Sequence, residues 1–344
     1  MKKIKIAVAG LGFGQSMVEN HIVSGPGSEY FELAALCDQN PQRLDAAVKK
    51  FGVLGFPDLE ELLKEKDIPA IGLFTGPVGR AEQIGKIIRA GKDVMTTKPF
   101  ELDSKKADAV LLESARLGRT VHLNSPSATY SKDLEIIEAW KVKYGLGRVI
   151  AGRHECWYKS VEKADGSWYD NPDLCPAAPV FRLGIYGIND MMQIFGEPES
   201  VQVMQSRIFT GRPTPDIAQL TIRFSNGAIV STLDGWCLQP PRGAESLAIY
   251  FENGTVFRGP ALTENTEGRV TMCVVPAVNG NGLPSETVSV SREELSHSYQ
   301  WEVFYKAIHG EKPANPTPAE VIVNGIKVIE AMRRSQNSGK TEMV

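Results

Sequence analysis

The chain has 344 residues, of which 42% are hydrophobic and 23% are charged, and its formal net charge at pH 7 is −3. This length predicts two domains, and the composition supplies enough apolar residues for two buried cores. The slightly acidic charge argues against nucleic acid or an anionic membrane surface as a partner, although a local arginine could still hold a small anionic substrate.

Cysteine usage and hydropathy indicate the compartment. The cysteines are odd in number and have no CxxC spacing, which favours idle thiols in a reducing environment over disulfides or a zinc site; they are Cys37, Cys156, Cys175, Cys237 and Cys273. The start "MKKIKIAVAG" lacks a signal-peptide pattern, and no apolar run reaches membrane-spanning length. We therefore expect a cytoplasmic protein.

The first predicted strand runs into a glycine-rich turn. In "KIKIAVAGLGFGQ", Gly10 and Gly12 match the first two glycines of G-x-G-x-x-G, whereas Gln15 stands at the third position and Gly14 precedes it. A helix over 13–25 is expected to follow. This strand–turn–helix context favours a dinucleotide-binding turn, with Phe13 beside the cofactor, over an ordinary βαβ turn.

An acidic residue follows the second predicted strand, which covers 31–37. Asp38 lies 28 residues after Gly10, where a dinucleotide fold places the carboxylate that binds the adenosine ribose hydroxyls. A carboxylate there repels a 2′-phosphate and favours NAD, whereas the nearby Arg43 favours NADP. The expected cofactor is NAD, with NADP as the alternative.

Strands and helices continue to alternate along the first third of the chain. Strands are expected over 69–75, 93–97 and 120–124, and helices over 78–91 and 103–118. This order predicts a parallel, doubly wound sheet, in which ligands bind at the carboxyl ends of the strands. The residues at those ends are candidate cofactor contacts: Thr75, Pro77, Lys98 and Asn124. Lys98 could equally be an ordinary surface lysine.

The stretch "FRLGIYGIND", residues 181–190, carries unusual polar groups for a helix. If it is α-helical, the spacing i, i+4, i+7 puts Arg182, Tyr186 and Asn189 on one face. A second face is apolar and is expected to be buried: Ile188, Met191, Met192 and Phe195. The polar face is a candidate substrate-binding surface.

Taken in order, these motifs resemble the Gfo/Idh/MocA oxidoreductases. The glycine turn, "TGP" at 75–77, "AGKDVMTTKPF", the "LGIYGIN" helix and the closing "PTPAEVIVNGIKVIEAMRRSQNSGK" all match in sequence and spacing. The resemblance implies an α/β protein with a Rossmann domain over 1–124. A second α/β domain over 125–344 would carry a large open, mainly antiparallel sheet, and its terminal helix could pack back on the first domain.

The second half of the chain fits that implied sheet. Strands are expected over 148–158, 200–209, 217–224, 228–236, 245–251 and 255–259. Asn226-Gly227 and Asn253-Gly254 are hairpin-turn signals between them. An open sheet face of this kind predicts a homodimer or homotetramer.

The chain also departs from the family pattern. Thr97 replaces the glutamate before the lysine–proline pair, and Arg80 stands near a frequent histidine. Arg182-x-Gly184-x-Tyr186 replaces D-x-G-x-H. Tyrosine at this last position resembles the branch of glucose–fructose oxidoreductase and dihydrodiol dehydrogenase.

The candidate chemistry is oxidation of a secondary alcohol. A group on the protein must take the hydroxyl proton, and we assign this acid/base role to Tyr186 with Lys98 as its electrostatic partner, or the reverse. Arg182 suits a substrate carboxylate or phosphate, or else a structural pair with Asp170 or Asp173. Asn189 and Asp190 could bind substrate hydroxyls, although Asp190 could instead cap or pair elsewhere.

Trp168 lies in an aromatic-rich stretch over 154–173 and could stack on a sugar, although such a stretch also suits an oligomer contact. No histidine or cysteine spacing predicts a metal site. The predicted function is an NAD(P)-dependent dehydrogenase of a sugar, polyol or sugar acid. A cofactor-recycling lyase, isomerase or glycosidase is the alternative, and a sugar or nucleotide sensor a weaker one.

Overall fold

The computed structural model describes residues 2–158, 164, 166–237, 244–259, 268–280 and 282–344. They form two compact units, one of Met1–Thr129 with Tyr299–Ala319 and one of Tyr130–Ser298 with Glu320–Val344. The first unit therefore contains residues 125–129 and 299–319 in addition to the segment 1–124 expected from the sequence. Part of the aromatic-rich stretch, residues 159–163 and 165, lies outside the described residues.

Within the described residues, the first unit holds a six-stranded sheet in the order β3-β2-β1-β4-β5-β6. Every neighbouring pair is parallel. The strands are β1 (Ile4–Ala9), β2 (Phe31–Cys37), β3 (Leu54–Phe56), β4 (Ala70–Leu73), β5 (Asp93–Thr96) and β6 (Val121–Leu123). This is the Rossmann order, whose direction of winding reverses between β1 and β4. The predicted doubly wound parallel sheet is confirmed.

Helices connect these strands. They are α1 (Leu11–Met17), continued as a π-helix over Val18–Val23, α2 (Pro41–Phe51), α3 (Leu59–Leu63), α4 (Arg80–Arg89), α5 (Ser104–Arg116) and α8 (Trp301–Ile308). Helix α8 belongs to the returning segment of the first unit. Its Trp301 and Phe304 are buried against Phe31 of β2, with ring centroids 5.5 Å apart in both pairs. The aromatic contacts explain why the returning segment joins the first core.

The second unit is built on a nine-stranded sheet, counted over the described residues, in the order β14-β13-β12-β11-β7-β10-β9-β8-β15. All of its pairs are antiparallel except the parallel pair β7–β10. The strands are β7 (Val149–Trp157), β8 (Pro198–Ser206), β9 (Ile217–Phe224), β10 (Ile229–Gly235), β11 (Ala244–Phe251), β12 (Gly254–Arg258), β13 (Arg269–Pro276), β14 (Glu286–Ser291) and β15 (Glu342–Met343). The mainly antiparallel sheet is confirmed. Strands β13, β14 and β15 were not among the strands expected from the sequence.

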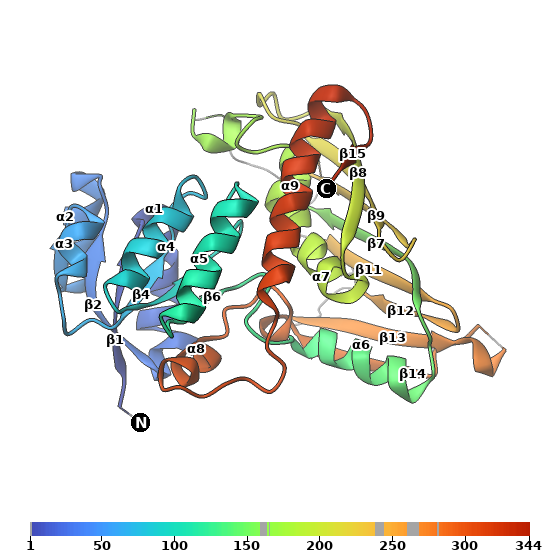
Figure 1. Cartoon of the computed structure of the whole chain (residues 1–344), viewed down its shortest axis with the longest axis horizontal. Helices are drawn as coiled ribbons and strands as arrows, with labels where there is room; N and C mark the ends of the chain where they lie inside the picture. The colour runs from blue at the N-terminus through green and yellow to red at the C-terminus, as the bar shows by residue number, and fades with distance from the viewer. Residues whose placement is uncertain (1, 159–163, 165, 238–243, 260–267, 281) are drawn as a thin grey trace. The chain divides into compact units, whose positions relative to one another are not determined.

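The helices of this unit lie on one face of the sheet (Figure 1). They are α6 (Lys132–Lys143), a π-helical turn over Val180–Gly184, α7 (Ile185–Phe195) and α9 (Ala319–Ser338). Short 3-10 turns lie at Pro26–Glu29, Trp168–Asp170, Ala277–Asn279 and Arg292–Glu294. Side chains of the central strands alternate, so Val230 and Thr232 are buried beneath the helices while Ile229 is half exposed on the other face. The predicted buried stripe of α7 is confirmed at Ile188, Met191, Met192 and Phe195.

Candidate functional site

The glycine turn after β1 is shaped by close backbone contacts. Gly10 has φ +88°, and a Cβ there would lie 2.8 Å from the backbone carbon of Phe74 and nitrogen of Thr75. A Cβ at Gly14 would lie 3.0 Å from Cγ1 of Val8, so Gly14 lets α1 pack closely on β1. Gly14 thus serves as the third glycine of the motif, one position before the expected site at Gln15. Phe13, half exposed, meets the edge of Phe74 at 6.0 Å.

Asp38 stabilises this turn through hydrogen bonds and an ion pair. Its Oδ2 accepts the backbone N–H of Leu11 at 2.7 Å and pairs with Arg43 Nη1 at 3.3 Å, while Oδ1 accepts the N–H of Asn40 at 2.8 Å. Oδ2 thus accepts from two donors and Oδ1 from one, so Oδ1 keeps acceptor capacity for a ribose hydroxyl. Arg43 Nη1 also lies 3.7 Å from the Cβ position of Gly12. A cation beside a bare backbone suits a dinucleotide diphosphate, and the residues therefore fit NAD(P).

Lys98 stands at the carboxyl end of β5 in a fixed backbone. Asn124, which follows β6, accepts the N–H of Lys98 at 3.1 Å and the hydroxyl of Thr97 at 3.3 Å through Oδ1. Arg80 is 1% exposed and donates to the carbonyls of Thr97 at 2.5 Å, of Pro99 and of Thr75. Arg80 therefore anchors the backbone on both sides of Lys98 and ties it to the end of β4.

The other predicted residue at the end of β4 is Pro77, whose carbonyl accepts the N–H of Arg80 at 3.3 Å. The hydroxyl of Thr75 lies 2.6 Å from Oε1 of Gln83 in α4. The structure thus brings Thr75, Lys98 and Asn124 to the carboxyl edge of the parallel sheet, where ligands bind in this fold. Their contacts with a cofactor stay predictions.

The segment before and within α7 approaches the second sheet unusually closely. A Cβ at Gly184 would overlap the carboxylate of Asp234, and one at Gly187 would overlap the ring of His154. Both partners are completely buried inward-facing residues, on β10 and β7 respectively. The two glycines in "LGIYG" therefore let the helix backbone cover a pair of ionisable side chains.

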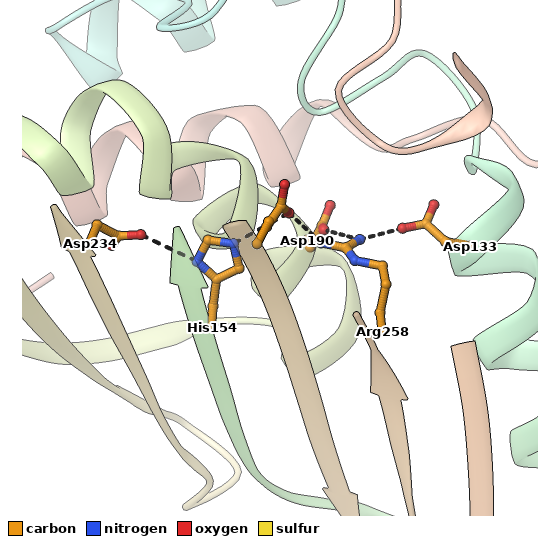
Figure 2. Close-up of polar contacts among 6 residues, drawn as sticks. Asp133, His154, Asp190, Asp234 and Arg258 are labelled. Atoms are coloured by element: carbon orange, nitrogen blue, oxygen red, sulfur yellow. Dashed lines mark hydrogen bonds and ion pairs between the residues drawn. The ribbon is translucent and has the colours of Figure 1, made fainter. Parts of the chain in front are cut away.

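These side chains belong to a buried charge cluster beneath α7, shown in Figure 2. We define it as six side chains from six different elements: Asp133 (α6), His154 (β7), Asp190 (α7), Asp234 (β10), Glu245 (β11) and Arg258 (β12). Arg258 donates to Asp133, to Asp190 at 3.0 Å and to Glu245 at 2.8 Å. His154 lies 3.6 Å from Asp234 and 3.5 Å from Glu245.

Burial and partner charges set the protonation of this charge cluster. Burial raises the pKa of Asp234 to about 7 and that of Asp190 to about 6, against the opposing charges of His154 and Arg258 respectively. Burial also raises the pKa of Glu245, but Arg258 outweighs it and holds that pKa well below its usual range. With four carboxylates around one guanidinium and one imidazole, Asp234 and then Asp190 take up protons as the pH falls through about 7 and about 6, which reduces the excess negative charge.

Arg182 lies in an aromatic environment. Its guanidinium carbon is 3.9 Å from the ring centroid of Tyr169 and 4.8 Å from that of Trp236. Trp168 stacks against Tyr169 with centroids 3.9 Å apart. Trp168 and Arg182 are thus brought together around one ring, as a substrate-binding role for both would require. Asp170, an alternative partner in the sequence analysis, bonds Arg212 through Oδ1 at 2.9 and 3.0 Å.

The three residues of the predicted polar face, Arg182, Tyr186 and Asn189, lie in three different environments. The assumption of a continuous α-helix was wrong, because Val180–Gly184 is π-helical and changes the angular spacing of its residues. Tyr186 is half-buried, and its ring meets that of His297 edge to face at 5.6 Å. Asn189 is 4% exposed and packs against Gly325 of α9, where its Oδ1 lies 2.6 Å from the Cβ position.

Tyr186 and Lys98 belong to different units, so their predicted partnership stays a prediction. His297 and the charge-cluster residues other than Asp190 were not assigned functional roles from the sequence. Their local patterns are those of ordinary strand, helix and loop residues, and the partners are far apart in the chain. The one local signal of the charge cluster was His154, a histidine at an inward position of a predicted strand.

The described residues contain no group of three or more histidine, cysteine, aspartate or glutamate side chains that could hold a metal ion. No described helix is both long and apolar enough to cross a membrane.

Comparison with known proteins identifies the family pattern. Residues 4–125 match the model of the oxidoreductase family with an NAD-binding Rossmann fold, and residues 143–257 match the model of the GFO/IDH/MocA C-terminal domain. Together the two models cover more than half of the chain.

Individual relatives are distant. The chain is 25% identical to dehydrogenase aclE of Aspergillus oryzae over 44% of this chain and 43% of that protein. It is 22% identical to D-apiose dehydrogenase of Paraburkholderia graminis over 72% of this chain and 64% of that protein. The chain thus aligns with less than two thirds of either curated relative. Among solved structures, aldose-aldose oxidoreductase from Caulobacter crescentus superposes with a TM-score of 0.76 at 20% identity, over 100% of both chains, which shows a shared fold.

Proposed function

The chain belongs to the Gfo/Idh/MocA family of NAD-binding oxidoreductases, and from that premise we propose that it oxidises a secondary alcohol of a sugar, polyol or sugar acid. The observation that carries the proposal is the placement of Lys98 at the carboxyl end of β5. Asn124 and Arg80 hold its backbone there. This edge of a doubly wound sheet is where a nicotinamide and its substrate would bind.

In this proposal, Tyr186 exchanges the proton of the substrate hydroxyl and Lys98 favours the phenolate by its positive charge. The nicotinamide, when bound, supplies the hydride acceptor. Lys98 also polarises the carbonyl oxygen in the reverse reaction. Trp168 offers an aromatic face to the C–H surface of a sugar ring, and it stacks on Tyr169 beside Arg182.

Arg182 is proposed to select an acidic substrate. A guanidinium is planar and presents its N–H groups in a fork that matches the bidentate geometry of a carboxylate, and the rings of Tyr169 and Trp236 lie against that of Arg182. The expected substrate is therefore a sugar acid or a polyol that carries a carboxylate. An Arg182→Met variant should lose more kcat/KM on an acidic substrate than on its neutral counterpart, by about tenfold or more, the cost of one charged hydrogen-bonded contact. Equal losses on both would remove the carboxylate assignment.

The proposal is tested by following absorbance at 340 nm. The purified protein, with NAD⁺ or NADP⁺, is offered sugars, inositols, polyols and their acids. Lys98→Met and Tyr186→Phe should each lower kcat by about 100-fold or more, because each removes a group that acts on the reacting oxygen. Lys105→Met in α5 and Tyr158→Phe are matched controls on exposed side chains and should keep wild-type rates.

Two results would redirect the assignment. If cofactor binding is measured directly but no member of the panel changes the absorbance, the dehydrogenase proposal fails. Substrate consumption without net NADH would then indicate a cofactor-recycling lyase, isomerase or glycosidase. If Tyr186→Phe turns over normally on the true substrate, Tyr186 is not the acid/base.

A further inference from the structure

We propose that His297 receives the phenol proton of Tyr186 during alcohol oxidation, and that Glu245 stabilises the imidazolium that forms. This inference rests on the proposed function and adds two residues to it. His297 acts through Tyr186, so it is a positioning and relay residue, whereas Tyr186 is the group that touches the substrate.

The first support is the direct contact between the two rings. The imidazole of His297 meets the phenol ring of Tyr186 at 5.6 Å between centroids, with planes inclined at 66°. Both residues belong to the second unit, so this contact is set within one compact body. Tyr186 is the second residue of α7, which begins directly after the π-helical turn, and Gly184 and Gly187 let that backbone lie against Asp234 and His154.

The second support is the charge around His297. The ring of Tyr186 on α7 contacts it, and the charges of four other groups act on it: Glu245 on β11, Arg258 on β12, Asp133 on α6 and Arg292 in its own segment. Burial lowers the pKa of His297, and the carboxylate of Glu245 is the chief group that raises it again. The imidazole is therefore neutral and able to accept a proton at pH 7, while an ionised carboxylate stands ready to balance the charge it gains.

Glu245 connects His297 to the charge cluster. Of the six cluster side chains, Glu245 is the most exposed at 25%, whereas Arg258 is 3% exposed and His154 is completely buried. Its Oε1 accepts from Arg258 at 2.8 Å and lies 3.5 Å from His154 Nε2. Arg258 keeps Glu245 ionised, and the contacts with Arg258 and His154 hold its carboxylate in place, which is the requirement for a group that stabilises an imidazolium.

The proton step balances without an additional reactant. The substrate O–H bond breaks and its proton moves to the Tyr186 oxygen, while the Tyr186 O–H bond breaks and its proton moves to an imidazole nitrogen of His297. The C–H bond of the alcohol breaks, and an oxidised nicotinamide, when bound, would accept the hydride. The alcohol is oxidised by two electrons to a ketone, the cofactor is reduced, and the half-buried His297 later releases its proton to water.

The kinetic test compares pH profiles of kcat for alcohol oxidation. His297→Gln and His297→Ala should each lower kcat by about 100-fold, the usual contribution of one proton-transfer group, with little change in KM. In wild type, kcat should fall at low pH because His297 becomes protonated and can no longer accept the phenol proton. This fall should disappear in both variants, because they lack the imidazole. Added imidazole should restore part of the lost rate to His297→Ala. His309→Gln, an exposed histidine of the first unit, is the matched control and should behave as wild type.

A double variant tests whether His297 acts through Tyr186. Tyr186→Phe combined with His297→Ala should be no slower than Tyr186→Phe alone, because without the phenol there is no proton for His297 to accept. Additive losses would overturn the relay. So would a His297→Gln variant that folds normally by circular dichroism and keeps the wild-type kcat and acidic limb.

A measurement independent of turnover completes the test. The His297 imidazole is titrated by NMR in the protein without cofactor, in wild type and in Glu245→Gln. Removing the carboxylate should lower the pKa of His297 further, whereas Glu294→Gln at an exposed position should leave it unchanged. An unchanged pKa in Glu245→Gln would overturn the role of Glu245. A wild-type protein that binds NAD and oxidises nothing in the panel would overturn the proposed function and the relay together, whereas normal turnover in His297→Gln would overturn the relay alone.

Discussion

At the residue scale, Arg80 supplies donors to three backbone carbonyls around Lys98. Arg80→Met keeps the apolar stem but leaves the carbonyls of Thr75, Thr97 and Pro99 without these donors in a buried setting. An unsatisfied buried carbonyl costs about 1–3 kcal/mol, and we expect a loss of about 3 kcal/mol in the free energy of unfolding. Urea denaturation measures it.

The control for this substitution lies on the same helix. Arg89→Met removes an exposed guanidinium that pairs with Glu113 at 2.6 Å, and surface pairs of this kind contribute little. Its unfolding midpoint should stay close to that of wild type. Equal destabilisation in the two variants would mean that Arg80 contributes no more than an ordinary surface arginine. An Arg80→Met protein that remains folded but loses NADH production would further support its role in placing Lys98.

At the element scale, the sequence predicted what local patterns encode. Strand–helix alternation and the glycine turn identified the parallel sheet, because the residues that form a βαβ turn are neighbours in the chain. The charge cluster could not be predicted in this way, because its partners are set by strand register. Cys156 pairs with Asp234 of β10 on one side and with Glu245 of β11 on the other, which places both carboxylates beside the buried His154. The π-helical turn was missed because its residue pattern also fits an α-helix.

The buried cluster predicts how stability depends on pH. Burial raises the pKa of Asp234 to about 7, so between pH 4 and pH 7 the folded protein keeps a proton that the unfolded chain loses. Stability from this group is therefore fully present at pH 4 and falls as pH rises to 7. Asp234→Asn imitates the protonated carboxyl and should remove this fall, gaining on wild type by about 3 kcal/mol across that range, since the raised pKa differs from the ordinary one by about three units. Urea unfolding at each pH measures the difference.

The companion variant for this experiment is Asp173→Asn, on an exposed aspartate of the same unit. Its difference from wild type should not change systematically between pH 4 and pH 7. If the difference between Asp234→Asn and wild type is also independent of pH, Asp234 is ionised throughout the range. The inference that folded Asp234 keeps its proton between pH 4 and pH 7 would then be wrong.

At the scale of the whole molecule, the face of the second sheet opposite the described helices of its own unit predicts self-association. Sheet register aligns Ile229, Ala151, Tyr250 and Thr255 in one row across β10, β7, β11 and β12, and Phe257 lies in the adjacent row opposite Ala248. Ile229, Tyr250 and Phe257 are 50%, 39% and 36% exposed. Helices α6, α7 and α9 lie on the opposite face (Figure 1). A broad, mildly apolar sheet face of this kind is typical of a subunit interface.

We expect light scattering after gel filtration to give a mass of at least twice the 37.6 kDa of one chain. Phe257→Glu places a charge in the centre of the proposed interface and should shift the protein toward monomer, because an unpaired charge is costly to bury between subunits. Val142→Glu on α6, at a position 83% exposed, adds the same charge away from that face and should leave the mass unchanged. If both variants keep the wild-type mass, the subunits associate through another surface; if wild type is itself a monomer, the sheet face has no such role.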